Sequence, residues 1–134
     1  MRNTKIHRQY GAVPFALDKG GRVRVVLLTS RQTGRWVIPK GWPMAGRKPT
    51  QAAVWEAYEE AGLIGAVSLG KPVGHYRYRK RLPTGKFVTC EVAVFLLRVR
   101  RELIDWPESE QRVRASRSFT KPIDSATAKA ATCC

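Results

Sequence analysis

One helix set among strands is the feature of this sequence that most limits its fold. Residues 49–61 are rich in Ala and Glu, Pro49 suits the first helical position or Thr50 the N-cap, and Gly62 supplies a C-terminal stop. The remaining chain holds an apolar, β-branched run at 23–29 and further strand-like segments at 10–17, 35–38, 63–69, 73–81 and 87–99. Strands, a helix and further strands predict an α/β (α+β) fold, as an α+β domain or a mixed α/β sandwich.

At 134 residues the chain is long enough for one compact domain with its own core. We predict a single domain over 1–119 and a weakly structured C-terminal tail over 120–134, whose Ala- and Thr-rich sequence has little to bury. Glycine and proline make 40–48 an irregular loop, and 107–112 is expected to form a short helix.

The sequence carries no apolar run near the ~20 residues that cross a bilayer, and its first ten residues do not resemble a signal peptide. Cys90 lies in an apolar run and is expected to be a buried thiol. A cytoplasmic protein is therefore predicted, as a monomer or a homodimer.

The charge is strongly positive, because 25 Lys and Arg outweigh 10 Asp and Glu to give a net charge of +15. Such a field favours polyanionic partners, and a phosphorylated small molecule is the preferred one. A nucleic-acid partner is compatible with this charge but less favoured. No amphipathic signal indicates a membrane, and a merely solvated basic surface is the alternative explanation.

Three of the few acids, Glu56, Glu59 and Glu60, lie within an arc of about 100° on the predicted helix. No Lys or Arg occurs between residues 51 and 69 to offset them. Oxygen ligands without His or Cys favour Mg²⁺ or Mn²⁺, which bind together with substrate phosphates. The alternative is a solvated acidic face. The residues expected to face the core are Val54, Tyr58 and Ala61.

The stretch 41–63, GWPMAGRKPTQAAVWEAYEEAGL, resembles the Nudix box, G-x5-E-x7-R-E-U-x-E-E-x-G-U with U apolar. The sequence matches the pattern at Gly41, Glu56, Ala57, Glu59, Glu60, Gly62 and Leu63. It departs at Arg47, where the pattern has Glu, and at Trp55, where the pattern has Arg. In the family these two residues brace the loop and the helix, so we interpret the departures as an altered brace.

Four segments outside the box are similar to the diphosphoinositol polyphosphate and diadenosine polyphosphate hydrolases of this family, namely residues 10–15, 25–31, 34–41 and 105–106. The resemblance covers about residues 8–119. It implies a mixed sheet between helices and a Mg²⁺-dependent hydrolase that cleaves a phosphoanhydride bond in a nucleoside diphosphate linked to a further group.

The resemblance also implies roles for the acids. Glu56 and Glu60 would be the principal metal ligands, and Glu59 a third ligand or the general base. Glu56 and Glu59 are both candidates for the general base. A backbone carbonyl of Lys40 or Gly41 would complete the coordination.

On the substrate side, the segments that contact phosphate in the family match Arg8, Gln9, Ser30 and Arg31. A second basic group is expected to cradle further phosphates: Arg77, Arg79, Lys80 and Arg81. Tyr76 and Tyr78 are assigned to one sheet face, with base stacking as the alternative. His75 has no partner in sequence and is assigned a structural role.

The preferred function is thus pyrophosphohydrolysis of a diadenosine polyphosphate, a diphosphoinositol polyphosphate or a similar small molecule. Two alternatives remain. One is an RNA 5′-pyrophosphohydrolase. The other is a catalytically weak Nudix-fold module that binds nucleotides or nucleic acid.

Overall fold

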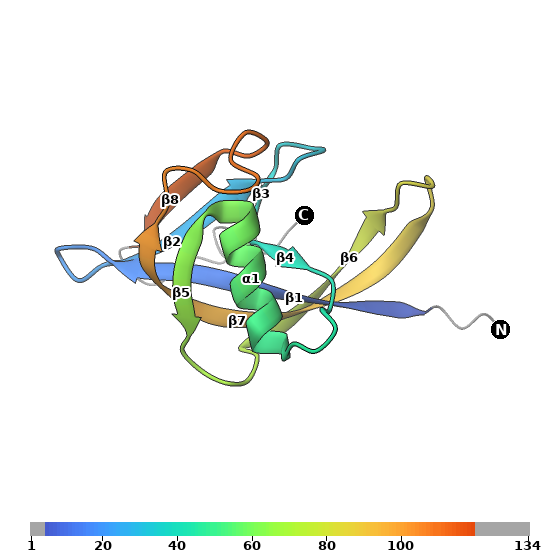
Figure 1. The fold of residues 1–134 in the computed structure, drawn as a ribbon, viewed down its shortest axis with the longest axis horizontal. Helices are drawn as coiled ribbons and strands as arrows, with labels where there is room; N and C mark the ends of the chain where they lie inside the picture. The colour runs from blue at the N-terminus through green and yellow to red at the C-terminus, as the bar shows by residue number, and fades with distance from the viewer. Residues whose placement is uncertain (1–4, 120–134) are drawn as a thin grey trace.

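The computed structural model describes residues 5–119, which form one twisted sheet with a helix across one face (Figure 1). The helix is α1 (Pro49–Ala61). The strands are β1 (Ile6–Leu17), β2 (Val23–Thr29), β3 (Trp36–Val37), β4 (Lys40–Gly41), β5 (Leu63–Val67), β6 (Gly74–Arg81), β7 (Phe87–Glu102) and β8 (Arg114–Phe119).

The sheet is organised around its two longest strands, β1 and β7, which run parallel from the Ile6–Thr89 pair to the Phe15–Arg98 pair. All other pairings are antiparallel. The first half of β7 pairs with β6 and its second half with β5, so the β6–β7 hairpin extends away from the rest of the sheet (Figure 1).

Alternation along the strands divides the core between the two sheet faces. Val26 and Leu28 of β2 face α1, whereas Val25 and Leu27 face the other side. The helix contributes only small residues to its side of the core, which lets it lie close to the sheet: Ala53, Ala57 and Ala61.

The helix begins and ends where local sequence dictates. Pro49 occupies the first turn, where a missing N–H has no cost, and the Lys48 amide donates to Gln51 Oε1 at 2.8 Å. Gly62 ends the helix in the left-handed region at φ 66°. A side chain at Gly62 would also meet Trp106, whose Cδ2 lies 2.6 Å from the position of a Cβ.

The predicted helix and the strand at 23–29 are confirmed in their bounds, as is the α+β class. The expected helix at 107–112 is wrong, since the chain there makes turns closed by the 3.0 Å Ser109–Trp106 backbone hydrogen bond. Strand β8 was not predicted, and the loop expected at 40–48 begins with the short strand β4.

The expectation of helices on both sides of the sheet is only partly met, because α1 is the one helix within residues 5–119. The tail expected to be weakly structured, residues 120–134, lies outside the described residues. Over the described range no helix has the length and apolarity needed to cross a membrane.

Candidate active site

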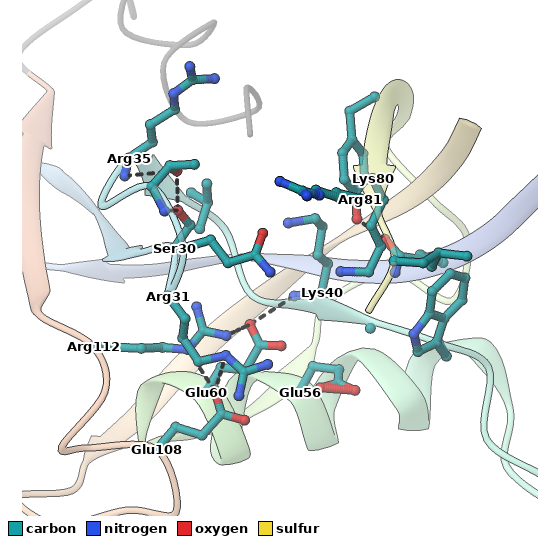
Figure 2. A pocket seen from close by; sticks show the side chains of 18 of the residues that line it. Ser30, Arg31, Arg35, Lys40, Glu56, Glu60, Lys80, Arg81, Glu108 and Arg112 are labelled. Atoms are coloured by element: carbon teal, nitrogen blue, oxygen red, sulfur yellow. Dashed lines mark hydrogen bonds and ion pairs between the residues drawn. The ribbon is translucent and has the colours of Figure 1, made fainter. Parts of the chain in front are cut away.

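A cleft of about 1220 Å³ opens between α1, the β2–β3 loop, β4 and the β6–β7 hairpin (Figure 2). Acidic side chains come from the helix at its base, while basic side chains come from the loop and the hairpin on its walls. The bottom of the cleft is therefore negatively charged and its walls are positively charged. A cation that binds together with phosphates requires this charge distribution.

Glu56 and Glu60, one turn apart on α1, are the buried acids of the cleft, with only 7% and 8% of their surface exposed. Burial is the main cause that raises the pKa of Glu56 to about 8, and the nearby carboxylates of Glu60 and Glu59 raise it further. Two carboxyls packed this closely repel each other when ionised, so the pair favours either a shared proton or a bound cation.

The pKa of Glu60 is raised less, to about 7, again mainly by burial. Two cationic groups oppose the shift: the Arg112 guanidinium, whose Nη2 is 3.7 Å from Glu60 Oε1, and Lys40. The Lys40 amide also donates to Glu60 Oε1 at 3.4 Å. Figure 2 shows Lys40 and Arg112 converging on Glu60 from opposite sides.

Strand β4 brings backbone against these acids, because its residues Lys40 and Gly41 pair with Gly11 and Tyr10 of β1. A Cβ at Gly41 would overlap the Glu56 carboxylate, so only glycine lets the backbone approach so closely. The two buried carboxylates offer oxygen ligands of the kind that Mg²⁺ or Mn²⁺ prefers, and the backbone of β4 passes close beside them. Over residues 5–119, no group of three or more His, Cys, Asp and Glu side chains is arranged to hold a metal ion by itself.

Arg112 and Glu108, from the β7–β8 connection, are cleft residues that sequence reasoning missed. Arg112 donates from Nε to Glu108 Oε1 at 2.7 Å and from Nη1 to the Thr29 carbonyl at 3.0 Å. We expected no basic residue to offset the negative charge of the helix acids. This expectation is wrong, because Arg112 lies beside them although it is distant in the sequence. The sequence offered one sign of this ion pair, namely the i,i+4 spacing of Glu108 and Arg112.

Most of the predicted phosphate-contacting residues line the cleft: Gln9, Ser30, Arg31, Arg79, Lys80 and Arg81. Arg8 and Arg77 are not among the lining residues. Arg77 instead donates to Glu91 at 2.9 Å in an exposed ion pair across β6 and β7. Strand alternation explains the split on β1, since Arg8 and Gln9 point to opposite faces.

The two tyrosines of β6 belong to the sheet, as predicted. Tyr76 and Tyr78 pack against the apolar cluster opposite α1, and the Tyr78 hydroxyl donates to Gln9 Oε1 at 2.5 Å. His75 lies outside the cleft lining, and Cys90 is buried as expected. Tyr58 was expected in the core, but it is only partly buried and borders a second hollow, which α1 and β5 line.

The family model described as "NUDIX domain" matches residues 6–129. The chain belongs to the Nudix family.

Among curated Nudix relatives, Nudix hydrolase 21, chloroplastic, from Arabidopsis thaliana is 32% identical over 126 residues. The match takes in 91% of this chain but 61% of that protein. Diphosphoinositol polyphosphate phosphohydrolase 3-alpha from Mus musculus is 33% identical over 85 residues, 63% of this chain and 47% of the relative. The chain thus spans about half to three fifths of the length of these two relatives.

Solved structures show the same fold. The Ap4A hydrolase of C. elegans in a binary complex has a TM-score of 0.59 at 20% identity, covering 84% of this chain and 78% of that chain. A NUDIX hydrolase from Nitrosomonas europaea has a TM-score of 0.61 at 19% identity, covering 86% and 72%.

This Nudix chain replaces two residues of the box pattern, and the two replacements contact each other. The Arg47 guanidinium lies over the Trp55 ring, 5.1 Å from its centre, and the Trp55 indole N–H donates to Glu59 Oε2 at 2.9 Å. At the two positions that we interpret as an altered brace, the structure thus has a cation–π contact followed by a hydrogen bond.

Proposed function

We propose that this Nudix domain is a divalent-cation-dependent pyrophosphohydrolase that cleaves a phosphoanhydride bond in a polyphosphorylated small molecule. The observation that carries the proposal is the buried Glu56–Glu60 pair, which opens into a cleft with basic walls. A buried acid pair is costly to ionise without a cation, and the surrounding arginines and lysines are suited to phosphate oxygens.

Glu56, Glu60 and a backbone carbonyl of Lys40 or Gly41 would hold Mg²⁺ or Mn²⁺. When bound, the ion would neutralise charge on the phosphate oxygens and act as a Lewis acid. Arg31 and Arg81, on opposite walls, would fix the phosphates on either side of the bond (Figure 2).

In the reaction, the oxygen of a water molecule forms a bond to phosphorus as the bond between phosphorus and the bridging oxygen breaks. The bridging oxygen leaves with the departing phosphate, and a carboxylate takes the proton from the water. Glu56 and Glu59 are the candidates for this carboxylate, because both line the cleft.

Aromatic rings at the cleft favour a substrate that carries a base. Trp42 and Phe87 line the cleft with 40% and 54% of their surface exposed, and Trp42 directly follows Gly41. Exposed aromatic faces beside a phosphate site are suited to stacking on nucleobases. A diadenosine polyphosphate is therefore the preferred substrate, ahead of a diphosphoinositol polyphosphate.

A substrate panel with Mg²⁺ and Mn²⁺ tests the proposal. The panel comprises diadenosine tetraphosphate, a diphosphoinositol phosphate, an NDP-sugar, an oxidised dNTP and 5′-triphosphate RNA. We expect turnover of diadenosine tetraphosphate that stops with EDTA and falls by about 1,000-fold in Glu60→Gln.

Binding without product release, with any divalent ion, would favour the alternative of a binding module. Turnover of RNA alone would favour the RNA 5′-pyrophosphohydrolase, which the net charge of +15 also supports.

A further inference from the structure

Glu59 differs from the other two helix acids in its burial and in its hydrogen-bond partner. Glu56 and Glu60 are buried against each other, while Glu59 is half-buried at the cleft and accepts the Trp55 indole N–H on Oε2. Trp55 lies four residues earlier on α1, so both side chains project from the same face of the helix. One carboxylate oxygen of Glu59 is thus engaged by Trp55.

Trp55 is itself fixed by two neighbours. The Arg47 guanidinium lies over its ring at 5.1 Å, and the Tyr58 ring lies 5.3 Å away at an angle of 56°. An indole held in this way is a rigid donor, whereas a solvated glutamate samples many rotamers. The three residues Arg47, Trp55 and Glu59 form a chain of contacts that ends at the cleft.

We propose that Trp55 is a positioning residue that orients Glu59 as the general base, a proposal that rests on the function proposed above. The indole N–H holds Oε2, which leaves Oε1 to accept the proton of the attacking water while its oxygen bonds to phosphorus and the bridging oxygen departs. Glu56 and Glu60 then remain the cation-binding pair.

Arg47 acts through Trp55, because its positive charge lies against the electron-rich ring face. Position 47 is cationic and position 55 carries a neutral hydrogen-bond donor, whereas the box pattern has an anion and a cation at these positions. Arg47 alone would face the arginine of the pattern, and Trp55 alone would place its ring face against the glutamate of the pattern. The two therefore work as a linked exchange that preserves a donor toward Glu59.

Trp55→Phe removes the N–H and keeps a ring under Arg47. We expect kcat to fall by about 10- to 100-fold, with KM and Mg²⁺ affinity within twofold of the original protein. In the Glu59→Gln background the same change should have no further effect, because residues that act as a unit are not additive. Trp36→Phe is the matched control, since Trp36 also lies under a guanidinium, that of Arg117, and lies outside the cleft lining.

The linked exchange is tested by restoring the box pattern. Arg47→Glu and Trp55→Arg should each lower kcat by at least tenfold, and the double variant should recover at least a third of the original kcat. Additive losses in the double variant, or a Trp55→Phe enzyme with unchanged kcat, would overturn the proposal. So would a Trp55→Phe effect that adds to that of Glu59→Gln.

The hydrogen bond can be tested without activity. The indole ¹H–¹⁵N resonance of Trp55, assigned by its loss in Trp55→Phe, should shift upfield in Glu59→Ala, while the other indole resonances stay in place. An unmoved resonance refutes the positioning role even if the protein is an active hydrolase. Failure of every substrate in the panel, with the shift present, refutes the proposed function instead.

Discussion

The Arg112 guanidinium binds the Glu108 carboxylate at 2.7 Å, with only 8% of the arginine side chain exposed. The same guanidinium reaches Glu60 of α1, at 3.7 Å from Nη2 to Oε1, and the Thr29 carbonyl of β2, at 3.0 Å. A residue from the β7–β8 connection therefore ties the acidic helix to the sheet. It also places a positive charge beside an otherwise repulsive pair of acids.

Removing this charge should destabilise the fold. We expect Arg112→Gln to lower the free energy of unfolding by about 3 kcal/mol, because the Glu108 and Glu60 carboxylates lose their buried partner. Urea unfolding measures the change. Arg77→Gln is the control: its ion pair with Glu91 is exposed, so the loss should stay below about 1 kcal/mol. Equal losses for the two variants would contradict a structural role for Arg112.

Stability of the metal-free protein should fall as the pH rises. The pKa values of Glu60 and Glu56 are raised to about 7 and about 8, so folding favours their protonated forms. This contribution is fully present below about pH 4.5 and is lost as the pH passes through 7 and 8. In EDTA, the Tm should therefore decline between pH 5.5 and pH 8.5.

Mg²⁺ should raise the Tm more at pH 8.5 than at pH 5.5, because only the ionised pair binds it. The double variant Glu56→Gln/Glu60→Gln is the control, and it should lose both the pH slope assigned to this pair and the response to Mg²⁺. A Tm that rises with pH in the original protein, but not in the double variant, would contradict the assignment of these shifts.

The close approach of β4 to the acids should be essential for activity. Gly41→Ala places a Cβ on the Glu56 carboxylate, and displacing that group should lower kcat/KM by about 100-fold. Gly74→Ala is the control, because a Cβ there meets nothing within 4 Å. Steady-state kinetics on the best substrate of the panel measure the effect. Near-normal activity in Gly41→Ala would show that the Glu56 position is not critical.

The hairpin should bind phosphate electrostatically. Arg81→Gln is expected to raise KM by about tenfold with little change in kcat, since Arg81 lines the cleft wall. Arg77→Gln removes the same charge from a residue outside the cleft lining and should change KM by less than twofold. The difference between the two variants should shrink at 1 M salt. Matching KM values at low salt would place the phosphates elsewhere.

Trp42 should distinguish substrates with and without a base. Trp42→Ala is expected to raise KM for diadenosine tetraphosphate by about tenfold, which corresponds to one lost stacking contact. A diphosphoinositol phosphate has no base, so its KM should stay within twofold. Parallel losses for both substrates would mean that Trp42 shapes the loop rather than the specificity.

The local parts of this protein could be predicted from its sequence. The bounds of α1 follow from Pro49 and Gly62, because capping depends on a few adjacent residues. The spacing of the three helix acids likewise fixes their common face. Hydrophobic runs located the longer strands, since alternation and β-branching act within each segment. The turns at 107–112 were mistaken for a helix because no local signal separates one turn from a short helix.

Which of the three acids is buried could not be read from the helix alone. Glu56 and Glu60 lie under β4 and the β7–β8 connection, while Glu59 stays at the rim with Trp55. That difference depends on how distant strands pack against α1. The position of Arg8 depends in the same way on strand register, which moves every side chain to the opposite face with a shift of one residue. Arg77 shares its strand face with Arg79 and Arg81, and it pairs with Glu91 of the neighbouring strand β7.

The amino-acid sequence by itself determined the helix, the carboxylates that it displays and the family pattern, because these rest on spacing within a short segment. Only the tertiary structure decided that Arg112 and Glu108 join the acids, that Arg47 lies over Trp55 and that Trp42 lines the cleft. Such contacts join segments far apart in the chain or depend on the path of a loop. Their geometry is set by the packing of the whole sheet and not by any local preference.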